Sequence, residues 1–434
     1  MLLRMTRIGV GRALLLSAGV VLWMPHGVAQ KLEITPAQIM SDEVATVQVN
    51  GLEPKARVSL HAELTDGAGE AWASEAEFEA DAAGVVDTSK QAPVKGSYRT
   101  ISAMGLVWSM TPKSKGVPTY RAPRGEGTQR IDISCARDGK QVATAELEET
   151  FRSPGVKRIE LTGQLHGYLF LPESAGPHPG ILVVGGSEGG VPQAKAEWLA
   201  RHGYVALALA YFRYEGLPPM LEDIPLEYFG KALAWMMHRP DVIPNEVGVM
   251  GTSRGGELAL QLGSVYPQIH AVVAYVPANV RYPSCCGRDM RAAWTLNGQA
   301  LAYVLPRSRR VADDMQAEIA VERTQGPILV VGAEDDGVWP SAAMTIAIQN
   351  RLKREHFKYE FVRLDYPHAG HRAGYPAVEP EWSSEVKQPV SGAEMNFGGT
   401  PEGNAASSLD AIPKVLAFLH RSLPGTEAPT TAQK

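Results

Sequence analysis

The chain has 434 residues, more than one hydrophobic core normally organises, so its length predicts two domains. Hydrophobic residues make up 44% of it and charged residues 21%, proportions typical of a soluble globular protein. The formal net charge is −5, and nucleic-acid-binding domains are usually basic, so the composition argues against a nucleic acid as partner.

Residues 1–29 have the pattern of a secretory signal peptide. Arg4, Arg7 and Arg12 give a basic start, residues 13–24 are apolar apart from one serine, and residues 27–29 are small enough for cleavage. The apolar stretch is shorter than the ~20 residues that span a bilayer, which disfavours a membrane anchor. We therefore expect cleavage, a periplasmic or secreted location, and no stable membrane span in the mature protein.

Residues 30–153 predict a β-sandwich. Apolar and polar side chains alternate over residues 57–64 and 131–135, which is typical of strands with one buried face. Asp138-Gly139 separates the second run from another that begins at Val142, and Asp-Gly between two such runs indicates a hairpin. Cys135 lies in this alternation and is expected to pack in the core. The adjacent Cys285 and Cys286 are not expected to form a disulfide framework, and no cysteine pattern suggests a metal site.

Residues 154–424 predict an α/β domain. Short runs that are apolar on both faces alternate with helical stretches, which indicates buried parallel strands joined by helices. The runs are residues 181–184, 204–210, 247–250, 271–276 and 328–331, with helices expected at residues 226–238 and 257–265. Residues 278–323 break this rhythm and are interpreted as an insertion over the active site. Residues 425–434 are polar and are expected to be a disordered tail.

The motif Gly251-Thr252-Ser253-Arg254-Gly255 follows one of these strands and precedes a helix. A strand–turn–helix setting is what the G-x-S-x-G nucleophile elbow requires, whereas the bare pattern is common by chance. Glycines allow the tight turn that exposes the Ser253 hydroxyl, which a general base must then activate. The alternative is an ordinary turn with Ser253 as a helix cap.

The base and the acid are predicted from the loops after later strands. His371 follows a glycine and is preferred as the base over His368, and Asp335 is preferred over its neighbour Asp336 as the carboxylate that orients the imidazole. The order Ser, Asp, His is that of α/β hydrolases. Three elements in this order, each after a predicted strand, make the signal specific.

Backbone donors for an oxyanion are expected at two places. One is the N–H of Arg254, directly after the nucleophile, and the other lies in the glycine-rich residues 185–190, with Gly186 and Ser187 as candidates. Reading that loop as a phosphate loop is disfavoured because it lacks the Gly-Lys-Ser/Thr ending. Tyr211 and Trp339 are further candidates to shape an acyl pocket, as is Tyr214.

Segments in both predicted domains resemble the family of type I acyl-CoA thioesterases and bile acid-CoA:amino acid N-acyltransferase. The likeness runs from about Ile34 to Leu423 and covers both domains in order. It is carried by residues 58–60, 72–76, 104–108, 155–156, 170–172, 208–211, 226–229, 251–258, 321–323 and 397–399, the last resembling a Trp-Gly-Gly of the family.

The resemblance implies an immunoglobulin-like N-terminal domain, an α/β-hydrolase domain with a Ser/Cys–His–Asp triad, and an acyl thioester substrate. Amino-acid-transferring members use cysteine as nucleophile, so Ser253 favours water as the acceptor. Family members act inside cells, where CoA is found, whereas a signal peptide implies an exported, bacterial-type member. The resemblance thus implies thioester hydrolysis, and the predicted location implies another ester or a thioester released there.

The sequence therefore predicts a serine hydrolase that cleaves an acyl thioester or ester through Ser253, His371 and Asp335 and an acyl-enzyme. No metal and no cofactor are expected. The alternatives are an acyltransferase that passes the acyl group to an amine, and a non-catalytic binding protein on the same scaffold. The sequence does not determine the acyl chain, the leaving group, the oligomeric state or the role of the N-terminal domain.

Overall fold

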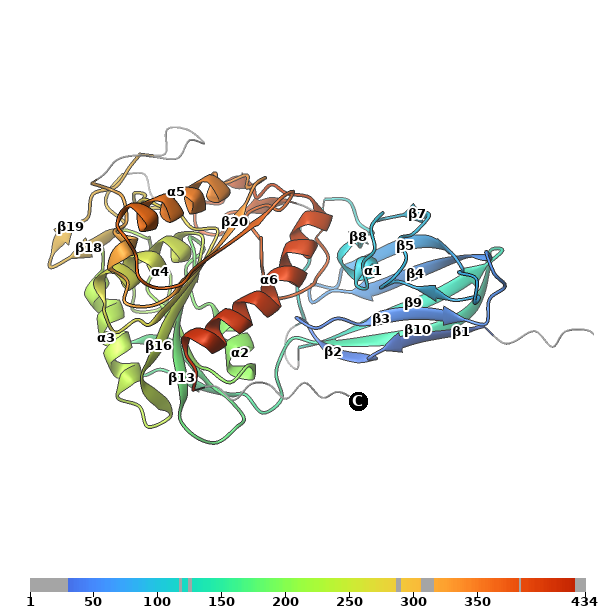
Figure 1. Ribbon diagram of the computed structural model, residues 1–434, viewed down its shortest axis with the longest axis horizontal. Coiled ribbons are helices and arrows are strands. Elements are labelled where there is room, and N and C mark those ends of the chain that lie inside the picture. Colours follow the sequence, from blue (N-terminus) through green and yellow to red (C-terminus); the bar gives the residue numbers. More distant parts are fainter. Residues whose placement is uncertain are drawn as a thin grey trace, which may run out of the picture.

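The computed structural model describes residues 30–116, 119–123, 127–285, 290–305, 316–381 and 384–425. The predicted signal peptide, residues 426–434 of the predicted tail, and Cys286 lie outside the described residues. Figure 1 shows two sheet-containing domains side by side, with the N-terminal strands on the right and the larger α/β domain on the left.

The N-terminal domain consists mainly of strands in two sheets. One sheet has the order β1-β3-β6, and the other has β2-β10-β9-β4-β5-β7, with β8 paired to β5. The elements are β1 (Lys31–Thr35), β2 (Gln38–Met40), β3 (Thr46–Asn50), β4 (Arg57–Thr65), β5 (Ala71–Glu79), β6 (Val86–Asp87), β7 (Lys95–Gly96), α1 (Gly105–Trp108), β8 (Thr111–Pro112), β9 (Thr128–Arg137) and β10 (Lys140–Thr150).

Alternation along these strands produces the core of the domain. Every second residue of β4 and β5 is buried, so one face of each strand packs inward. The predicted Asp138-Gly139 hairpin is confirmed: it joins β9 to β10, and both residues have positive φ, 50° and 73°. Cys135 is a free thiol buried in this core, as predicted.

The second domain is built on a large, mostly parallel sheet of order β11-β12-β14-β13-β16-β17-β20-β21. β11, β12 and β14 pair antiparallel, and the pairs from β14 to β21 are parallel. The strands are β11 (Lys157–Glu160), β12 (His166–Leu171), β13 (His178–Val184), β14 (Val205–Ala210), β16 (Val242–Thr252), β17 (Ala271–Tyr275), β20 (Ile328–Ala333) and β21 (Phe361–Tyr366). Each predicted apolar run of this domain lies within or overlaps one of these strands.

Helices cover both faces of this sheet. One face packs against α3 (Leu226–Met237), α4 (Arg254–Val265) and α5 (Ser341–Arg354), and the other against α2 (Gln193–Arg201) and α6 (Pro401–Ser422). Figure 1 shows α6 between the large sheet and the N-terminal domain. Because both faces are covered, the central strands are apolar throughout, as β14 and β17 show.

The predicted insertion leaves the sheet after β17 and returns before β20. It contains β18 (Trp294–Leu296), β19 (Gln299–Ala300) and the short 3-10 helix Val321–Arg323, and β18 pairs with β15 (Ile224–Pro225). Within it, residues 286–289 and 306–315 are not described. A hairpin of β22 (Glu385–Lys387) and β23 (Glu394–Asn396) precedes α6.

Buried polar contacts join the two domains. Asp42 of the N-terminal domain forms an ion pair with Arg201, and its carboxylate accepts hydrogen bonds from the Trp198 ring N–H at 2.7 Å and from His202 Nε2 at 2.9 Å. Val378 and Ala405 of the α/β domain pack into the N-terminal core. Among the described residues, no helix has both the length and the apolar character needed to cross a bilayer.

Candidate active site

Ser253 lies at a tight turn between β16 and α4. Its backbone has φ 59° and ψ −121°, a conformation that L-residues rarely adopt and that persists only where surrounding structure holds it. A Cβ on Gly251 would lie 2.0 Å from the Gly255 oxygen, and one on Gly255 would lie 2.3 Å from the Gly185 oxygen. The two glycines of the motif are therefore required sterically, and together with the strand order this turn is that of the α/β-hydrolase fold.

His371 and Asp336 complete a hydrogen-bonded chain with Ser253. His371 Nε2 lies 2.8 Å from Ser253 Oγ, and His371 Nδ1 lies 2.8 Å from Asp336 Oδ2. The side chains of His371 and Asp336 are 4% and 0% exposed, so water does not compete for the contact between them. The structure thus brings together the predicted Ser253 and His371.

The sequence-based preference for Asp335 over Asp336 does not agree with this geometry. Asp335 Oδ2 lies 3.4 Å from Nδ1 of the exposed His368, and its side chain is 53% exposed. The Asp336 backbone forms a bridge with Gly398, and Asp336 Oδ1 accepts hydrogen bonds from the N–H groups of Val338 and Trp339 at 2.9 and 3.2 Å. Asp335 lies in the turn after β20 and its carboxylate faces the exposed His368, so Asp336 is the residue of the pair that reaches His371.

A segment near the C-terminus holds the His371 loop. The His371 N–H donates to the Phe397 oxygen at 2.7 Å, and the Phe397 ring contacts the imidazole at 5.3 Å between centroids. A Cβ on Gly370 would lie 2.2 Å from the Gly398 oxygen. In the sequence, residues 397–399 carry only a resemblance to a Trp-Gly-Gly, and no local pattern indicates that they contact the histidine.

Two of the predicted oxyanion donors lie beside Ser253. The N–H of Arg254 opens α4, and no acceptor for it is found among the described residues. The N–H of Gly186 donates to Glu188 Oε1 at 2.9 Å, and a Cβ on Gly186 would lie 3.4 Å from the Ser253 Cβ. Ser187 lines the same cavity. The hydrogen bond that the structure gives its backbone is at the carbonyl oxygen, which accepts from Gln388 Nε2 at 2.9 Å.

The Arg254 side chain has a separate, structural contact. Its Nη1 lies 2.9 Å from Glu257 Oε2 in a fully buried ion pair, and its Nη2 donates to the carbonyl oxygens of Tyr282 and Pro283. Glu257 also accepts from the Trp294 ring N–H at 2.7 Å. Burial raises the pKa of Glu257, and the Arg254 guanidinium opposes that shift. This pair fastens the insertion to the helix that begins at the nucleophile.

A cavity of about 650 Å³ opens at Ser253 and His371. Apolar side chains of the α/β domain, such as Trp339 and Phe397, form much of its wall, and Tyr120 of the N-terminal domain also lines it. Of the aromatic residues predicted to shape the pocket, Trp339 does so and packs edge-on against His371. Tyr211 instead donates to the Gly185 oxygen at 2.7 Å, and Tyr214 packs against His166.

Cys285 lines this cavity and is disulfide-bonded, so the expectation that this cysteine takes part in no disulfide is wrong.

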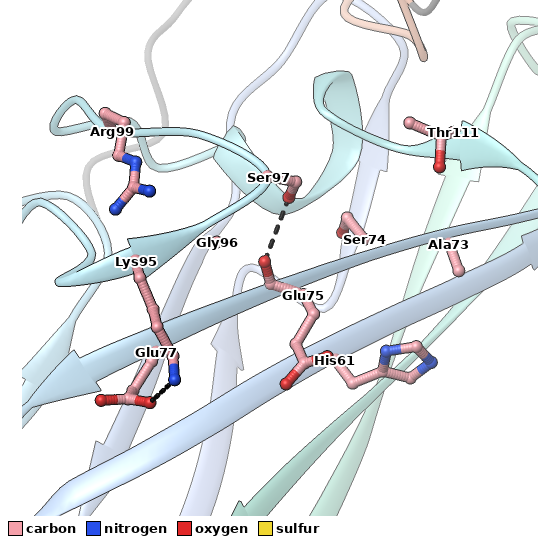
Figure 2. Close-up of a pocket in the computed structure, with 10 residues that line it drawn as sticks. All are labelled: His61, Ala73, Ser74, Glu75, Glu77, Lys95, Gly96, Ser97, Arg99 and Thr111. Carbon is pink, nitrogen blue, oxygen red and sulfur yellow. Dashed lines mark hydrogen bonds and ion pairs between the residues drawn. The ribbon is translucent and has the colours of Figure 1, made fainter.

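A second groove, of about 730 Å³, lies on the N-terminal domain (Figure 2). Two of its charged groups, Lys95 and Glu77, contact each other at 2.9 Å, and His61 contacts the neighbouring Glu63 at 2.6 Å. No hydroxyl faces His61 in the manner of Ser253 and His371, as far as the described residues show. The Ser253 cavity is therefore the candidate active site.

Comparison with known proteins identifies relatives over both domains. The family description "Acyl-CoA thioester hydrolase/BAAT N-terminal region" matches residues 42–163, and "BAAT / Acyl-CoA thioester hydrolase C terminal" matches residues 224–425. Human mitochondrial acyl-coenzyme A thioesterase 2 is 30% identical over 96% of this chain and 89% of its own length. Rat acyl-coenzyme A thioesterase 1 is 31% identical over 88% of this chain and 94% of its own length.

Among solved structures, an α/β hydrolase from a deep-sea metagenome library aligns with 63% of this chain and 100% of its own, at 16% identity and a TM-score of 0.39.

Proposed function

Because the chain belongs to the acyl-CoA thioester hydrolase/BAAT family and is accordingly a hydrolase, we propose that it cleaves acyl thioesters through a covalent acyl-Ser253 intermediate. The observation that carries this proposal is the chain of two 2.8 Å contacts from Asp336 through His371 to Ser253. A serine hydroxyl is a weak nucleophile, and an adjacent imidazole that can accept its proton is what activates it.

In the acylation step, the Ser253 oxygen bonds to the acyl carbon while its proton passes to His371 Nε2. Asp336 accepts from the Nδ1–H, which selects the tautomer whose Nε2 is free and stabilises the imidazolium that forms. The N–H groups of Arg254 and Gly186 are the proposed donors to the oxyanion. When the tetrahedral intermediate collapses, the carbon–sulfur bond breaks and His371 returns the proton to the leaving thiolate.

Hydrolysis of the acyl-enzyme repeats these proton transfers with water. His371 removes a proton from water, hydroxide adds to the ester carbon, and Ser253 leaves with the proton from His371. The acyl chain is proposed to lie in the 650 Å³ cavity, against Trp339 and Phe397, where burial of apolar surface supplies affinity. No residue of this scheme requires a cofactor.

The test measures acid released from a panel of acyl-CoA thioesters and p-nitrophenyl esters by wild type and Ser253→Ala. We expect hydrolysis by wild type and a loss of roughly a thousandfold or more in kcat for the variant. Addition of glycine or taurine tells whether water or an amine accepts the acyl group, because transfer to the amine would yield an N-acyl product in place of the free acid. Equal rates for wild type and Ser253→Ala would refute the proposal.

We propose further that residues 1–29 direct export, on the basis of their basic start, apolar stretch and small residues before position 30. An exported enzyme would meet few CoA thioesters, which is why the substrate panel includes oxygen esters. Expression of the full chain, followed by cell fractionation and the intact mass of the product, tests export. Unprocessed protein confined to the cytoplasm would contradict it.

A further inference from the structure

Two charged side chains of the Ser253 cavity have no part in the acyl transfer proposed above. Glu188 lies on the loop between β13 and α2, and Lys195 lies in the first turn of α2. Glu188 contacts Gly186, and Lys195 contacts Thr252, which directly precedes the nucleophile. The two side chains therefore touch the two backbone segments that flank the site of reaction.

Glu188 occupies one of the proposed oxyanion donors. Its Oε1 accepts the Gly186 N–H at 2.9 Å, and its Oε2 would lie 2.6 Å from a Cβ placed on Gly186, itself 3.4 Å from the Ser253 Cβ. A carboxylate thus lies where the carbonyl oxygen of a bound acyl group needs a hydrogen bond. The other proposed donor, the Arg254 N–H, has no acceptor among the described residues and is therefore available to the carbonyl oxygen of an incoming acyl group.

Among the described residues, the Lys195 amine has no carboxylate partner. Its Nζ donates to the Thr252 hydroxyl and lies 4.0 Å from the centre of the Tyr275 ring, and the described residues place no acidic oxygen within ion-pair distance of it. Burial lowers the pKa of Lys195 to about 7, and the charge of Glu188 opposes this shift. Glu188 is thus the anion whose field reaches Lys195 while its carboxylate is bonded elsewhere.

A carboxylate and an oxyanion cannot share the Gly186 N–H. The donor has one hydrogen, and two negative oxygens side by side repel each other. A neutral acyl carbonyl is a weaker acceptor than a carboxylate, because hydrogen bonds to charged groups are roughly twice as strong as neutral ones. The oxygen of the tetrahedral intermediate is charged, so it accepts a hydrogen bond from the Gly186 N–H about as strongly as the Glu188 carboxylate does.

On the basis of the proposed function, we propose that Glu188 is a positioning residue that holds the oxyanion site closed until the reacting acyl group displaces it, and that the displaced carboxylate moves to Lys195. No carbon, nitrogen or oxygen bond changes in this exchange. The Gly186 N–H passes from the carboxylate to the oxyanion, and the Lys195 ammonium gains the carboxylate.

The loop is built so that the side chain of Glu188 can move without its backbone. The Glu188 carbonyl oxygen accepts from Arg213 Nη1 at 3.1 Å, and the Gly190 N–H donates to the Phe212 oxygen at 3.1 Å. These two hydrogen bonds hold the main chain of the loop against the segment that follows β14. The Glu188 side chain is exposed, so its departure requires rotation in solvent and no repacking of the core.

A trifluoromethyl ketone with an alkyl chain tests this exchange, because such ketones add the serine oxygen and form a stable oxyanion. The dissociation constant of the adduct is measured by ¹⁹F NMR titration, which does not depend on turnover. Glu188→Ala should bind the ketone about tenfold more tightly than wild type, because no acceptor has to leave the Gly186 N–H. Lys195→Met should bind it about tenfold more weakly, because the displaced carboxylate finds no cation.

The decisive comparison is Lys195→Met in two backgrounds. If Lys195 acts by receiving Glu188, the loss of affinity disappears when Glu188→Ala is already present, and Lys195→Arg restores part of it in the wild-type background. A structural role for Lys195 would weaken binding equally in both backgrounds, and that result overturns the proposal. So does weaker ketone binding by Glu188→Ala.

Two controls complete the design. Glu215→Ala removes another exposed carboxylate close in the chain and outside the cavity lining, and should leave the dissociation constant unchanged. Ser253→Ala should form no adduct. If wild type also forms none, the proposed nucleophile is wrong and this proposal falls with it; if wild type forms the adduct and the Glu188–Lys195 coupling is zero, the proposed function stands and this inference alone fails.

Discussion

Asp335 and Asp336 are consecutive residues, and each faces a histidine, but the two pairs lie in opposite surroundings. The Asp335–His368 pair is 53% and 76% exposed with a contact of 3.4 Å, whereas the Asp336–His371 pair is 0% and 4% exposed with a contact of 2.8 Å. In water a pair of this kind contributes little, because solvent screens it and the side chains lose entropy. Buried, the same residue types form a contact that can orient an imidazole, so the surroundings decide which pair can take part in chemistry.

The largest expected effect is the difference in kcat between a variant of Asp336 and the same change at Asp335. Asp336→Asn should lower kcat by about 10⁴-fold, because an amide stabilises the wrong imidazole tautomer and no imidazolium. Asp335→Asn should leave kcat within about twofold, because its partner His368 is in solvent. Steady-state hydrolysis of one p-nitrophenyl ester by both variants measures the two kcat values. A large loss of kcat in Asp335→Asn would indicate that Asp335, and not Asp336, orients His371.

A smaller effect is expected for stability, where buried and exposed ion pairs can again be compared. Glu257→Gln should lower the free energy of unfolding by about 3–5 kcal/mol, because it leaves the Arg254 guanidinium buried without a counter-charge. Glu360→Gln breaks the exposed pair with Arg421, a 3.0 Å contact, and should cost less than about 1 kcal/mol. Urea unfolding of both variants measures the difference, and similar losses would show that burial does not set the contribution of the pair.

Glu381 is expected to make the stability of the protein depend on pH. It is buried, and its Oε1 lies 3.6 Å from Arg372 Nη2. Burial raises the pKa of Glu381 to about 7, and the charge of Arg372 opposes that shift. A group whose pKa is raised on folding stabilises the protein below its unfolded pKa and loses that contribution as the pH rises through the folded value. Relative to Glu381→Gln, the free energy of unfolding of wild type should therefore fall by roughly 3 kcal/mol between about pH 4.5 and 7.

Urea unfolding of wild type and Glu381→Gln across that range gives the measurement. Because the other titrating groups are common to both proteins, the difference between the two curves isolates residue 381. Parallel curves would mean that Glu381 is ionised in the folded protein throughout.

Local patterns in the sequence predicted much of the fold and part of the site. Buried runs such as residues 181–184 and 271–276 predicted strands because a covered parallel strand must be apolar on both faces. The Ser253 motif was identifiable because the strained turn requires glycines at 251 and 255. His371 was identifiable from its place after the last strand of the sheet and from the glycine before it, which distinguishes it from His368.

The choice between Asp335 and Asp336 was beyond those patterns. The two residues have the same chemistry and lie only one position apart after the strand, and what separates them is the bridge of Asp336 with Gly398, more than 60 residues away in the sequence. The contact of Phe397 with His371 was missed for a similar reason, since no spacing rule connects a hairpin before α6 to the loop after β21.

The sequence by itself determined that strands dominate the N-terminal part, which strands form the large sheet, and the tight turn at Ser253, because these depend on side-chain periodicity and on steric requirements within a few residues. Only the tertiary structure decided which carboxylate faces His371, that Tyr120 lines the cavity, and that Glu188 covers the Gly186 N–H. These contacts depend on the packing of segments distant in the chain or on the rotation of a single side chain, and neither leaves a periodic signal in the sequence.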